Sequence, residues 1–358
     1  MGRISMELKE LGMDSWFGNH VREFCAVEQR LARVMVVDRG QYTVRSEHGD
    51  VPAKATRKFM KATTSSIDMA CVGDWVCMDN QDSEEYASIH AVLPRKSFLR
   101  RKSAGKSTKL QMIAANIDVI FIAQSCHYDF NVSRLERYLV MATEGHVTPV
   151  IILTKTDLVS TDVLQQFITE IRDKGISAQI IALSNVTGAG LNQVKESMEC
   201  GKTYCLVGSS GVGKSTLINQ LRGDDTLRTQ TVSTSGEGRH TTVRRQLFVL
   251  EQGALLIDTP GMREVGILAV GDGMDDNFDD IKDLALQCRF TNCGHGNELG
   301  CAVLHAIKEG ELHLERYQNY IKLKMESEIN ENLNSRKVKK YRSSGHGIHH
   351  VKKRMSKS

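Results

Sequence analysis

The sequence lacks any long apolar run and any N-terminal targeting signal. No apolar stretch approaches the ~18 residues that a membrane-spanning helix needs. The N-terminal residues, MGRISMELKELGMDSWF, contain neither an apolar core nor a small-residue cleavage site, so they do not form a secretory signal. We therefore expect a cytoplasmic protein that has no membrane partner.

The sequence lacks a high density of cysteine, with nine residues in a chain of 358. This is far below the density of proteins that are held together by disulfides. In a reducing compartment, a cysteine cluster instead indicates a metal site or a catalytic site. Six cysteines are scattered, mostly in apolar runs, and we interpret them as packing residues of the core: Cys25, Cys71, Cys77, Cys126, Cys200 and Cys205.

Strong net charge is also absent, because the formal net charge is only +4. Positive charge is nevertheless concentrated in two segments. Residues 95–109 are basic, and residues 336–358 contain nine Lys or Arg and no Asp or Glu. This distribution favours a polyanionic partner. The alternative is a solvated linker and a solvated tail.

The composition, 41% hydrophobic and 25% charged, is that of a globular protein, and the length predicts two or three domains. A helical or loose leader over 1–30 precedes short apolar strands that are punctuated by Gly and Asp. These strands predict a small five-stranded β-barrel over 31–103. An oligonucleotide-binding (OB) barrel fits this size, and the alternative is an SH3-like barrel used for protein contact.

Strands and helices alternate over 104–275, which predicts a doubly wound, mostly parallel sheet. Residues 276–335 carry metal-ligand-type residues and a helical pattern, in which Leu314, Tyr317, Ile321 and Met325 share one face. The basic tail, 336–358, is expected to be disordered. The fold class is therefore multidomain α/β.

A phosphate-binding loop is the strongest motif. It follows the strand TYCLV, opens the helix TLINQLRG and fits the GxxxxGK[ST] pattern. Glycines let the backbone N–H groups point inward, the lysine provides positive charge to the β- and γ-phosphates, and the serine hydroxyl can bind Mg²⁺. The nucleotide-binding residues of this segment are Gly208, Ser209, Ser210, Gly211, Val212, Gly213, Lys214, Ser215 and Thr216.

The tetrapeptide Thr154, Lys155, Thr156 and Asp157 predicts that the base is guanine. It ends a strand and resembles the Asn-Lys-x-Asp element of GTPases. Asp157 can accept two hydrogen bonds from N1–H and the exocyclic amine of guanine, a donor pair that adenine lacks. Thr154 replaces the usual Asn, which we expect to weaken the bracing of this loop. Ser184 and Asn185 end another strand and resemble the second base-contacting element.

Two further segments complete a GTPase site. Asp258 and Gly261 resemble the DxxG element, with Asp258 reaching Mg²⁺ through water and the Gly261 N–H facing the γ-phosphate. A switch segment contains His240, Thr241 and Thr242, and one of the two threonines would bind Mg²⁺. The base-recognition elements precede the phosphate loop, which reverses the usual order and indicates a circularly permuted GTPase domain.

Four residues near the C-terminus have the spacing C-x₄-C-x-H-x₅-C: Cys288, Cys293, His295 and Cys301. Three thiolates and one imidazole make a closed tetrahedral set, so we predict one structural Zn²⁺ per chain. The alternatives are reduced core cysteines or an iron–sulfur cluster.

These motifs together closely resemble the RsgA (YjeQ) family, the GTPases that depend on the small ribosomal subunit. The resemblance covers about residues 30–325 and includes VGDWV, RKSFLRRK, IAANIDVIFIAQS, TKTD, GSSGVGKST, GEGRHTT, DTPGMRE and the Cys/His cluster. It implies an OB-type barrel, a permuted GTPase domain and a zinc domain. It also implies late maturation of the 30S subunit, contact with 16S rRNA, and GTP hydrolysis that this subunit stimulates. We further expect a monomer.

Catalysis needs a group that orients the attacking water. Met262 stands where small GTPases place Gln and cannot hydrogen-bond water, so His240 is the candidate for this role. Two rival hypotheses remain. One is a GTP-gated RNA-binding module in which hydrolysis is incidental, and the other is a P-loop ATPase that acts on nucleic acid.

Overall fold

The computed structural model describes residues 6–38, 40–63, 65–79, 86–102, 110–127, 130–223, 245–258 and 277–325. The chain begins with two short helices, α1 (Met6–Glu10) and α2 (Ser15–Phe24). Asp14 caps α2 by accepting hydrogen bonds from the backbone N–H groups of Trp16 and Phe17. Residues 6–10 and 15–24 of the expected leader are thus helical, and the apolar residues Leu11 and Phe17 are buried.

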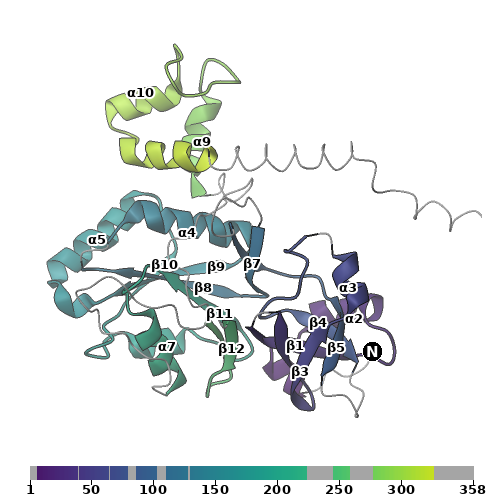
Figure 1. The fold of residues 1–358 in the computed structure, drawn as a ribbon. Coiled ribbons are helices and arrows are strands. Elements are labelled where there is room, and N and C mark those ends of the chain that lie inside the picture. Colours follow the sequence, from purple (N-terminus) through teal and green to yellow (C-terminus); the bar gives the residue numbers. More distant parts are fainter. Residues whose placement is uncertain are drawn as a thin grey trace, which may run out of the picture.

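A closed five-stranded barrel follows the leader, as the sequence predicts (Figure 1). Its strands pair in the order β1-β2-β3-β5-β4, and β4 pairs back onto β1. All pairs are antiparallel except β3 with β5. The short helix α3 lies between β3 and β4 in the chain. The bounds are β1 (Arg30–Asp38), β2 (Gln41–Ser46), β3 (Gly49–Ala55), α3 (Arg57–Ala62), β4 (Trp75–Asp79) and β5 (Ala87–Val92).

A hairpin of β6 (Phe98–Lys102) and β7 (Leu110–Ala115) connects the barrel to the next part of the chain. Part of the basic segment 95–109, for which a solvated linker was the alternative interpretation, thus lies in a strand. Arg100 of β6 forms an ion pair with Glu144. This hairpin spans the domain boundary predicted at residue 103, and the domain division stays a prediction.

The predicted doubly wound sheet is present, and its strand order shows which edge of the sheet is expected to bind ligands. Five strands are parallel, in the order β10-β9-β8-β11-β13, and β12 pairs antiparallel with β13. The strand order reverses between β8 and β11, and ligands of such sheets bind at the carboxyl ends of the strands at this point. The bounds are β8 (Val119–Ser125), β9 (Thr148–Thr154), β10 (Gln179–Ala182), β11 (Thr203–Gly208), β12 (Arg245–Val249) and β13 (Leu255–Asp258).

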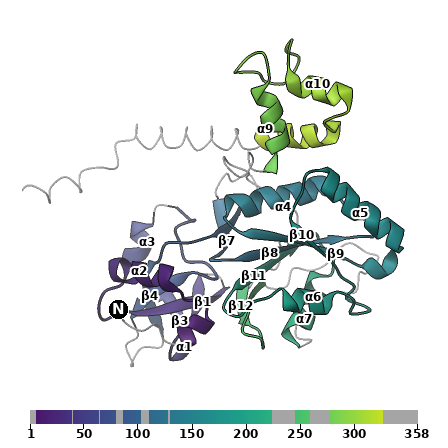
Figure 2. The same ribbon diagram turned by 180° about the vertical axis from the view of Figure 1, so that it is seen from behind.

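Helices cover both faces of this sheet (Figures 1 and 2). Helices α4 (Val132–Glu144) and α5 (Thr161–Asp173) cover one face, and α6 (Leu191–Glu196) and α7 (Lys214–Arg222) cover the other. Leu135 of α4 belongs to a core that includes Ile122 of β8, whereas Leu217 of α7 packs in a separate core with Phe121. Alternate residues of a strand point to opposite faces, which explains the two cores.

The barrel and the parallel sheet are continuous, because β12 pairs antiparallel with β1. Arg33 of β1 is 1% exposed and fixes this junction. Its guanidinium donates to the carbonyls of Leu11, Gly73 and Asn116 and to the hydroxyl of Thr203. Burial lowers the pKa of Arg33 to about 10. One side chain thus joins leader, barrel and sheet.

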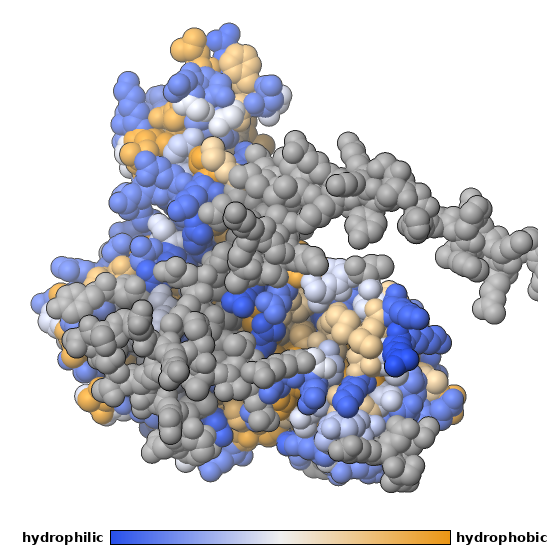
Figure 3. All heavy atoms as spheres, in the orientation of Figure 1, coloured by the Kyte–Doolittle hydropathy of each residue, from blue (hydrophilic) through white to orange (hydrophobic). Residues whose placement is uncertain are grey.

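The C-terminal domain contains α9 (Asp279–Leu286), α10 (Ala302–Glu309) and a helix over 314–325, and it rests on α4. Figure 3 shows mainly hydrophilic residues where the two meet. The last helix agrees with the helical pattern of the sequence. On the face that carries the four periodic residues, Leu314 and Met325 are more than half exposed, while Tyr317 and Ile321 are half-buried. The buried positions are Arg316, Asn319 and Leu323. Arg316 and Asn319 bind Glu136 of α4, and Leu323 belongs to an apolar cluster that includes Val140 of α4.

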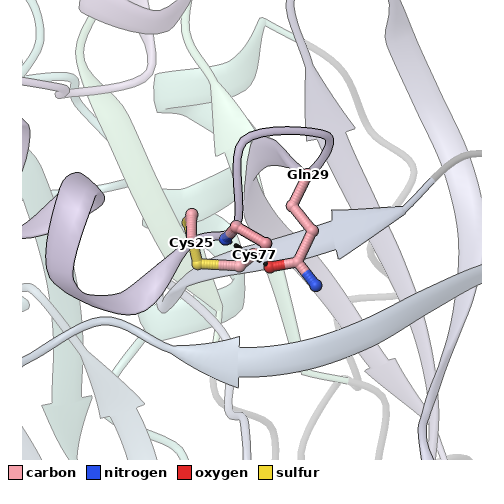
Figure 4. Close-up of a disulfide and its surroundings, with 4 residues drawn as sticks. Cys25, Gln29 and Cys77 are labelled. Atoms are coloured by element: carbon pink, nitrogen blue, oxygen red, sulfur yellow. Dashed lines mark hydrogen bonds between the residues drawn. A yellow bond between two sulfur atoms is a disulfide. The ribbon is translucent and has the colours of Figure 1, made fainter.

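Cys77 is buried in the core and Cys25 packs against it, as expected, but the two also form a disulfide that ties the end of α2 to β4 (Figure 4). The core position expected for Cys200 is wrong, because Cys200 is exposed. The loop after α2 is held further by the backbone N–H of Ala26, which donates to the side chain of Gln29. Cys71, Cys126 and Cys205 are buried, as expected. None of the helices in the described parts of the chain combines the length and apolar character that crossing a bilayer requires.

Candidate GTP site and metal centre

The phosphate loop connects β11 to α7, at the edge where the strand order reverses. Gly208 has a φ of 142°, and a Cβ there would lie 2.3 Å from the Ala123 carbonyl oxygen of β8. Gly213 has a φ of 97°, and a Cβ there would approach the Asn185 amide. Only glycine therefore permits both this backbone path and this packing.

Lys214 lies across the loop that it follows. Its ammonium donates to the Gly208 carbonyl at 2.7 Å and also to the Ser209 carbonyl. A positive charge is thus held over the first residues of the loop. A phosphate group bound by the loop would meet this charge together with the backbone N–H groups at the start of α7.

The two predicted base-recognition segments lie next to each other. Asp157 belongs to a short 3₁₀ helix, Thr156–Leu158, that follows β9, and the hydroxyl of Ser184 donates to its carboxylate at 2.6 Å. Ser184 is buried, and its Oγ also accepts from the backbone N–H groups of Val186 and Thr187. Lys155 adopts a left-handed φ of 59° between the strand and this helix.

Both segments are also attached to the phosphate loop. The hydroxyl of the buried Thr154 donates to the Val212 carbonyl at 2.7 Å, so this position still braces the loop although Asn is absent. The Asn185 side chain donates to the Gly213 carbonyl at 3.1 Å. Segments for the base and for the phosphates are therefore joined directly, despite their reversed order in the chain.

Asp258 ends β13 at the same edge of the sheet. Burial raises the pKa of this carboxyl to about 6, although the positive charges of Arg222 and Lys214 act in the opposite direction. A half-buried carboxylate close to Lys214 and at the carboxyl end of a parallel strand is a suitable ligand for a hydrated Mg²⁺. The predicted residues His240, Thr241, Thr242 and Gly261, like the basic tail, lie outside the described residues.

The four predicted metal ligands meet in the C-terminal domain. The ligand atoms of Cys288, Cys293, His295 and Cys301 all lie within 4.8 Å of one another. The Nδ1 atom of His295 lies 3.6 Å from the Cys288 sulfur and 3.5 Å from the Cys301 sulfur, and these sulfurs are 3.9 Å apart. A zinc tetrahedron with Zn–S bonds of about 2.3 Å has edges of about 3.6–3.8 Å. The donor set therefore fits Zn²⁺ in size and chemistry.

The surroundings favour ligation. Burial lowers the pKa of His295, with a contribution from Lys324, which favours the neutral imidazole that binds metals. The backbone N–H of Ala302 faces the Cys288 sulfur, and that of Leu304 faces the Cys301 sulfur. Tyr317, which the sequence did not single out for this site, donates its hydroxyl to the His295 carbonyl at 2.5 Å.

Sequence reasoning also missed residues around the nucleotide site. Arg134 of α4 donates to the hydroxyl of Ser209 in the phosphate loop. Gln220 of α7 donates to the Asn185 carbonyl at 2.8 Å. Both residues belong to helices whose periodicity was visible, but no motif marks a contact that spans 75 residues of the chain.

Comparisons with known proteins identify the family. The model of the RsgA GTPase family matches residues 92–268. The small ribosomal subunit biogenesis GTPase RsgA 2 of Lactiplantibacillus plantarum is 42% identical over 87% of this chain and 86% of its own length. This chain belongs to the RsgA GTPase family. A namesake from Vibrio vulnificus is 35% identical, over 96% of this chain and 95% of its own.

Solved structures agree with the RsgA fold. The crystal structure of YjeQ from Thermotoga maritima superposes with a TM-score of 0.60 at 25% identity, covering 84% of this chain and 98% of that one. YloQ, described as a circularly permuted GTPase, gives a TM-score of 0.56 at 20% identity, over 84% of this chain and 96% of its own, which supports the fold alone. A model of ABC transporters also matches residues 191–350, a range that contains the phosphate loop.

Proposed function

We propose that this RsgA-family GTPase hydrolyses GTP in the cytoplasm during late maturation of the small ribosomal subunit, and that the nucleotide controls its binding to and release from 16S rRNA. The curated relatives are named small ribosomal subunit biogenesis GTPases. The observation that carries the GTPase part is the direct attachment of Thr154 and Asn185, from the base-recognition segments, to the phosphate loop. One guanine nucleotide can therefore contact both sets of residues.

Each predicted residue has a role in this proposal. Asp157 and Ser184 select guanine, while residues 208–216 bind the phosphates with Lys214. Mg²⁺, when bound, neutralises charge that develops on the β- and γ-phosphates. Ser215, Asp258 and either Thr241 or Thr242 would hold it. In this proposal the Gly261 N–H would face the γ-phosphate, and His240 would orient the attacking water, a role that Met262 cannot fill.

The proposed partner is the 30S subunit, contacted through 16S rRNA. The basic segments at 95–109 and 336–358 are the proposed rRNA contacts. Within the first, Arg95, Lys96 and Arg100 form ion pairs with Asp74, Asp14 and Glu144, so the contact would depend on the remaining cations of the two segments. Binding through phosphate groups weakens as salt displaces the protein, so we expect the affinity for 30S subunits to fall between low and moderate salt. We propose one Zn²⁺ per chain and a monomer.

The deciding experiment measures GTP turnover by the full chain with 30S subunits, with 50S subunits and alone. We expect slow turnover alone and with 50S subunits, and a marked stimulation with 30S subunits only. Equal stimulation by both subunits, or by neither, would contradict the proposal.

The absence of a water-orienting side chain at Met262 favours one alternative, a GTP-gated RNA-binding module in which hydrolysis is incidental. Two measurements separate the hypotheses: single-turnover GTP hydrolysis with and without 30S subunits, and the rate at which the protein leaves the 30S subunit. An RNA-binding module would leave at the same rate with GTP and with a non-hydrolysable analogue. A P-loop ATPase is tested by competition: excess ATP would displace labelled GTP from an ATPase.

A further inference from the structure

Arg134 contacts the phosphate loop from outside the recognised GTPase motifs. It lies in the first turn of α4 and donates from Nη1 to the hydroxyl of Ser209. The carbonyl oxygen of Ser209 also accepts a hydrogen bond from the ammonium of Lys214. Two cations from different elements therefore hold the same loop residue, one at its side chain and one at its backbone.

The same turn of α4 holds the C-terminal domain. Glu136 is 3% exposed, and its two carboxylate oxygens accept from Arg316 at 2.5 Å and from Asn319 at 2.5 Å. Arg316 is 6% exposed and also donates to both carboxylate oxygens of Asp280, at 2.6 and 2.7 Å. Asn319 reaches the Ser133 carbonyl as well. Replacing one member would leave buried charges unpaired, which strongly disfavours the docked state.

A cavity of about 590 Å³ lies between these two sets of contacts. Arg134 and Ser209 line it on the side of the phosphate loop, and Asn319 and Lys322 line it on the side of the C-terminal domain. The loop and the domain thus face the same space across α4. Hydrogen bonds attach Arg316 and Asn319 to Glu136 and Ser133 of α4, and another attaches Arg134 to Ser209, so the start of α4 connects the C-terminal domain with the phosphate loop.

We propose that Arg134 is a positioning residue for the phosphate loop, and that docking of the C-terminal domain through Arg316 holds it in place. The C-terminal domain then influences nucleotide affinity without contacting the nucleotide. When the domain is docked, α4 presents Arg134 to Ser209 and the loop keeps the backbone path that receives phosphate. Movement of the domain shifts α4 and releases Ser209.

This inference deepens the proposed function and rests on guanine nucleotide binding at the phosphate loop. The test is a double-mutant cycle in the full chain, with dissociation constants of fluorescent GTP and GDP analogues measured without ribosomal subunits. Arg134→Ala and Ser209→Ala should each weaken binding by about tenfold, the effect of losing one hydrogen bond to a charged group. The double variant should bind no more weakly than either single variant, and Arg134→Lys should recover part of the affinity.

A second cycle tests the role of the domain. Arg316→Lys should weaken nucleotide binding in the wild-type background and have no further effect in the Arg134→Ala background. Two controls accompany it. Arg100→Ala removes the ion pair with Glu144 at the opposite end of α4 and should lower the melting temperature without changing nucleotide affinity. Lys322→Ala removes a positive charge from the wall of the same cavity and should leave affinity unchanged.

Several results would overturn the inference. They are additive effects in either cycle, wild-type affinity of Arg134→Ala, or an equal loss of affinity in Lys322→Ala. Failure of the proposed function is distinguishable, because it would appear as missing stimulation by 30S subunits while these dissociation constants still follow the cycle.

Discussion

The hydroxyl of Ser184 donates a hydrogen bond of 2.6 Å to the carboxylate of Asp157. This contact joins residues that are 27 positions apart and that come from the ends of neighbouring parallel strands, β9 and β10. It fixes one oxygen of Asp157 and so limits how the carboxylate can turn. A carboxylate held in one orientation is suited to accept two parallel hydrogen bonds from a planar base.

Asp157→Asn should change the base that is selected. Guanine would lose its two bonds to a carboxylate, so GTP affinity should fall by about 100-fold or more. Xanthine carries a carbonyl where guanine carries its exocyclic amine, and the new amide can donate to it, so XTP affinity should rise. Competition of GTP and XTP against a labelled analogue measures both. Unchanged preference for GTP would remove Asp157 from base recognition, and Asp162→Asn, on the neighbouring α5, is the matched control.

Metal analysis of the purified chain should find one zinc per molecule. Cys293→Ser should lose the metal and unfold the C-terminal domain, because its apolar core is small and the metal links residues 288–301. The exposed Cys200 provides the control, since Cys200→Ser should keep both metal and fold. Iron, or no metal in a fully folded chain, would contradict the zinc assignment. Limited proteolysis before and after chelation reports the unfolding.

The sequence predicted those features that rest on local chemistry. The phosphate loop, the Cys/His spacing and the strand–helix alternation each depend on short segments, and the structure brings the ligands of the metal site together as predicted. Features that rest on contacts between distant segments were missed. The Cys25–Cys77 disulfide joins residues 52 positions apart. The buried polar positions of the helix over 314–325, Arg316 and Asn319, pair with Glu136 of α4, a contact that apolar periodicity does not indicate.

Asp258→Asn should stabilise the nucleotide-free protein while weakening its use of Mg²⁺. Burial raises the pKa of this carboxyl from its ordinary 3.8 to about 6, so the folded state favours the protonated form more than the unfolded state does. The protonated carboxyl therefore favours folding. This contribution to the free energy of unfolding is complete below pH 4, and it is lost as the pH rises through 6 and Asp258 ionises in the folded protein. At pH 8 the amide variant should gain about 2 kcal/mol in free energy of unfolding.

Denaturant unfolding at pH 5 and pH 8 measures this gain, which should be smaller at pH 5. In the wild type, Mg²⁺-dependent GTP binding should also decline as the pH falls below 6, because the ionised carboxylate is lost. A variant whose stability gain is the same at both pH values would show that Asp258 does not titrate in this range.

The Cys25–Cys77 disulfide should stabilise the barrel under oxidising conditions. Closing a loop of this length restricts the unfolded chain by about 4 kcal/mol in the chain-entropy description. Reductant should therefore lower the free energy of unfolding of the wild type, and it should have no effect on a Cys25→Ser/Cys77→Ser variant. Thiol titration of the oxidised, unfolded and metal-free chain should find seven reactive cysteines. Nine would show that the bond does not form.

His240→Ala should abolish the turnover that 30S subunits stimulate, while GTP affinity stays within a few-fold of the wild type. The reason is chemical, since Met262 cannot hydrogen-bond the attacking water and His240 is the imidazole of the predicted switch segment. Affinity is determined elsewhere, by the phosphate loop and Asp157, so the substitution should lower kcat and leave the dissociation constant unchanged. His313→Ala, in the C-terminal domain, is the control. Stimulated turnover at the wild-type rate would exclude His240 from catalysis and would require another source for the water-orienting group.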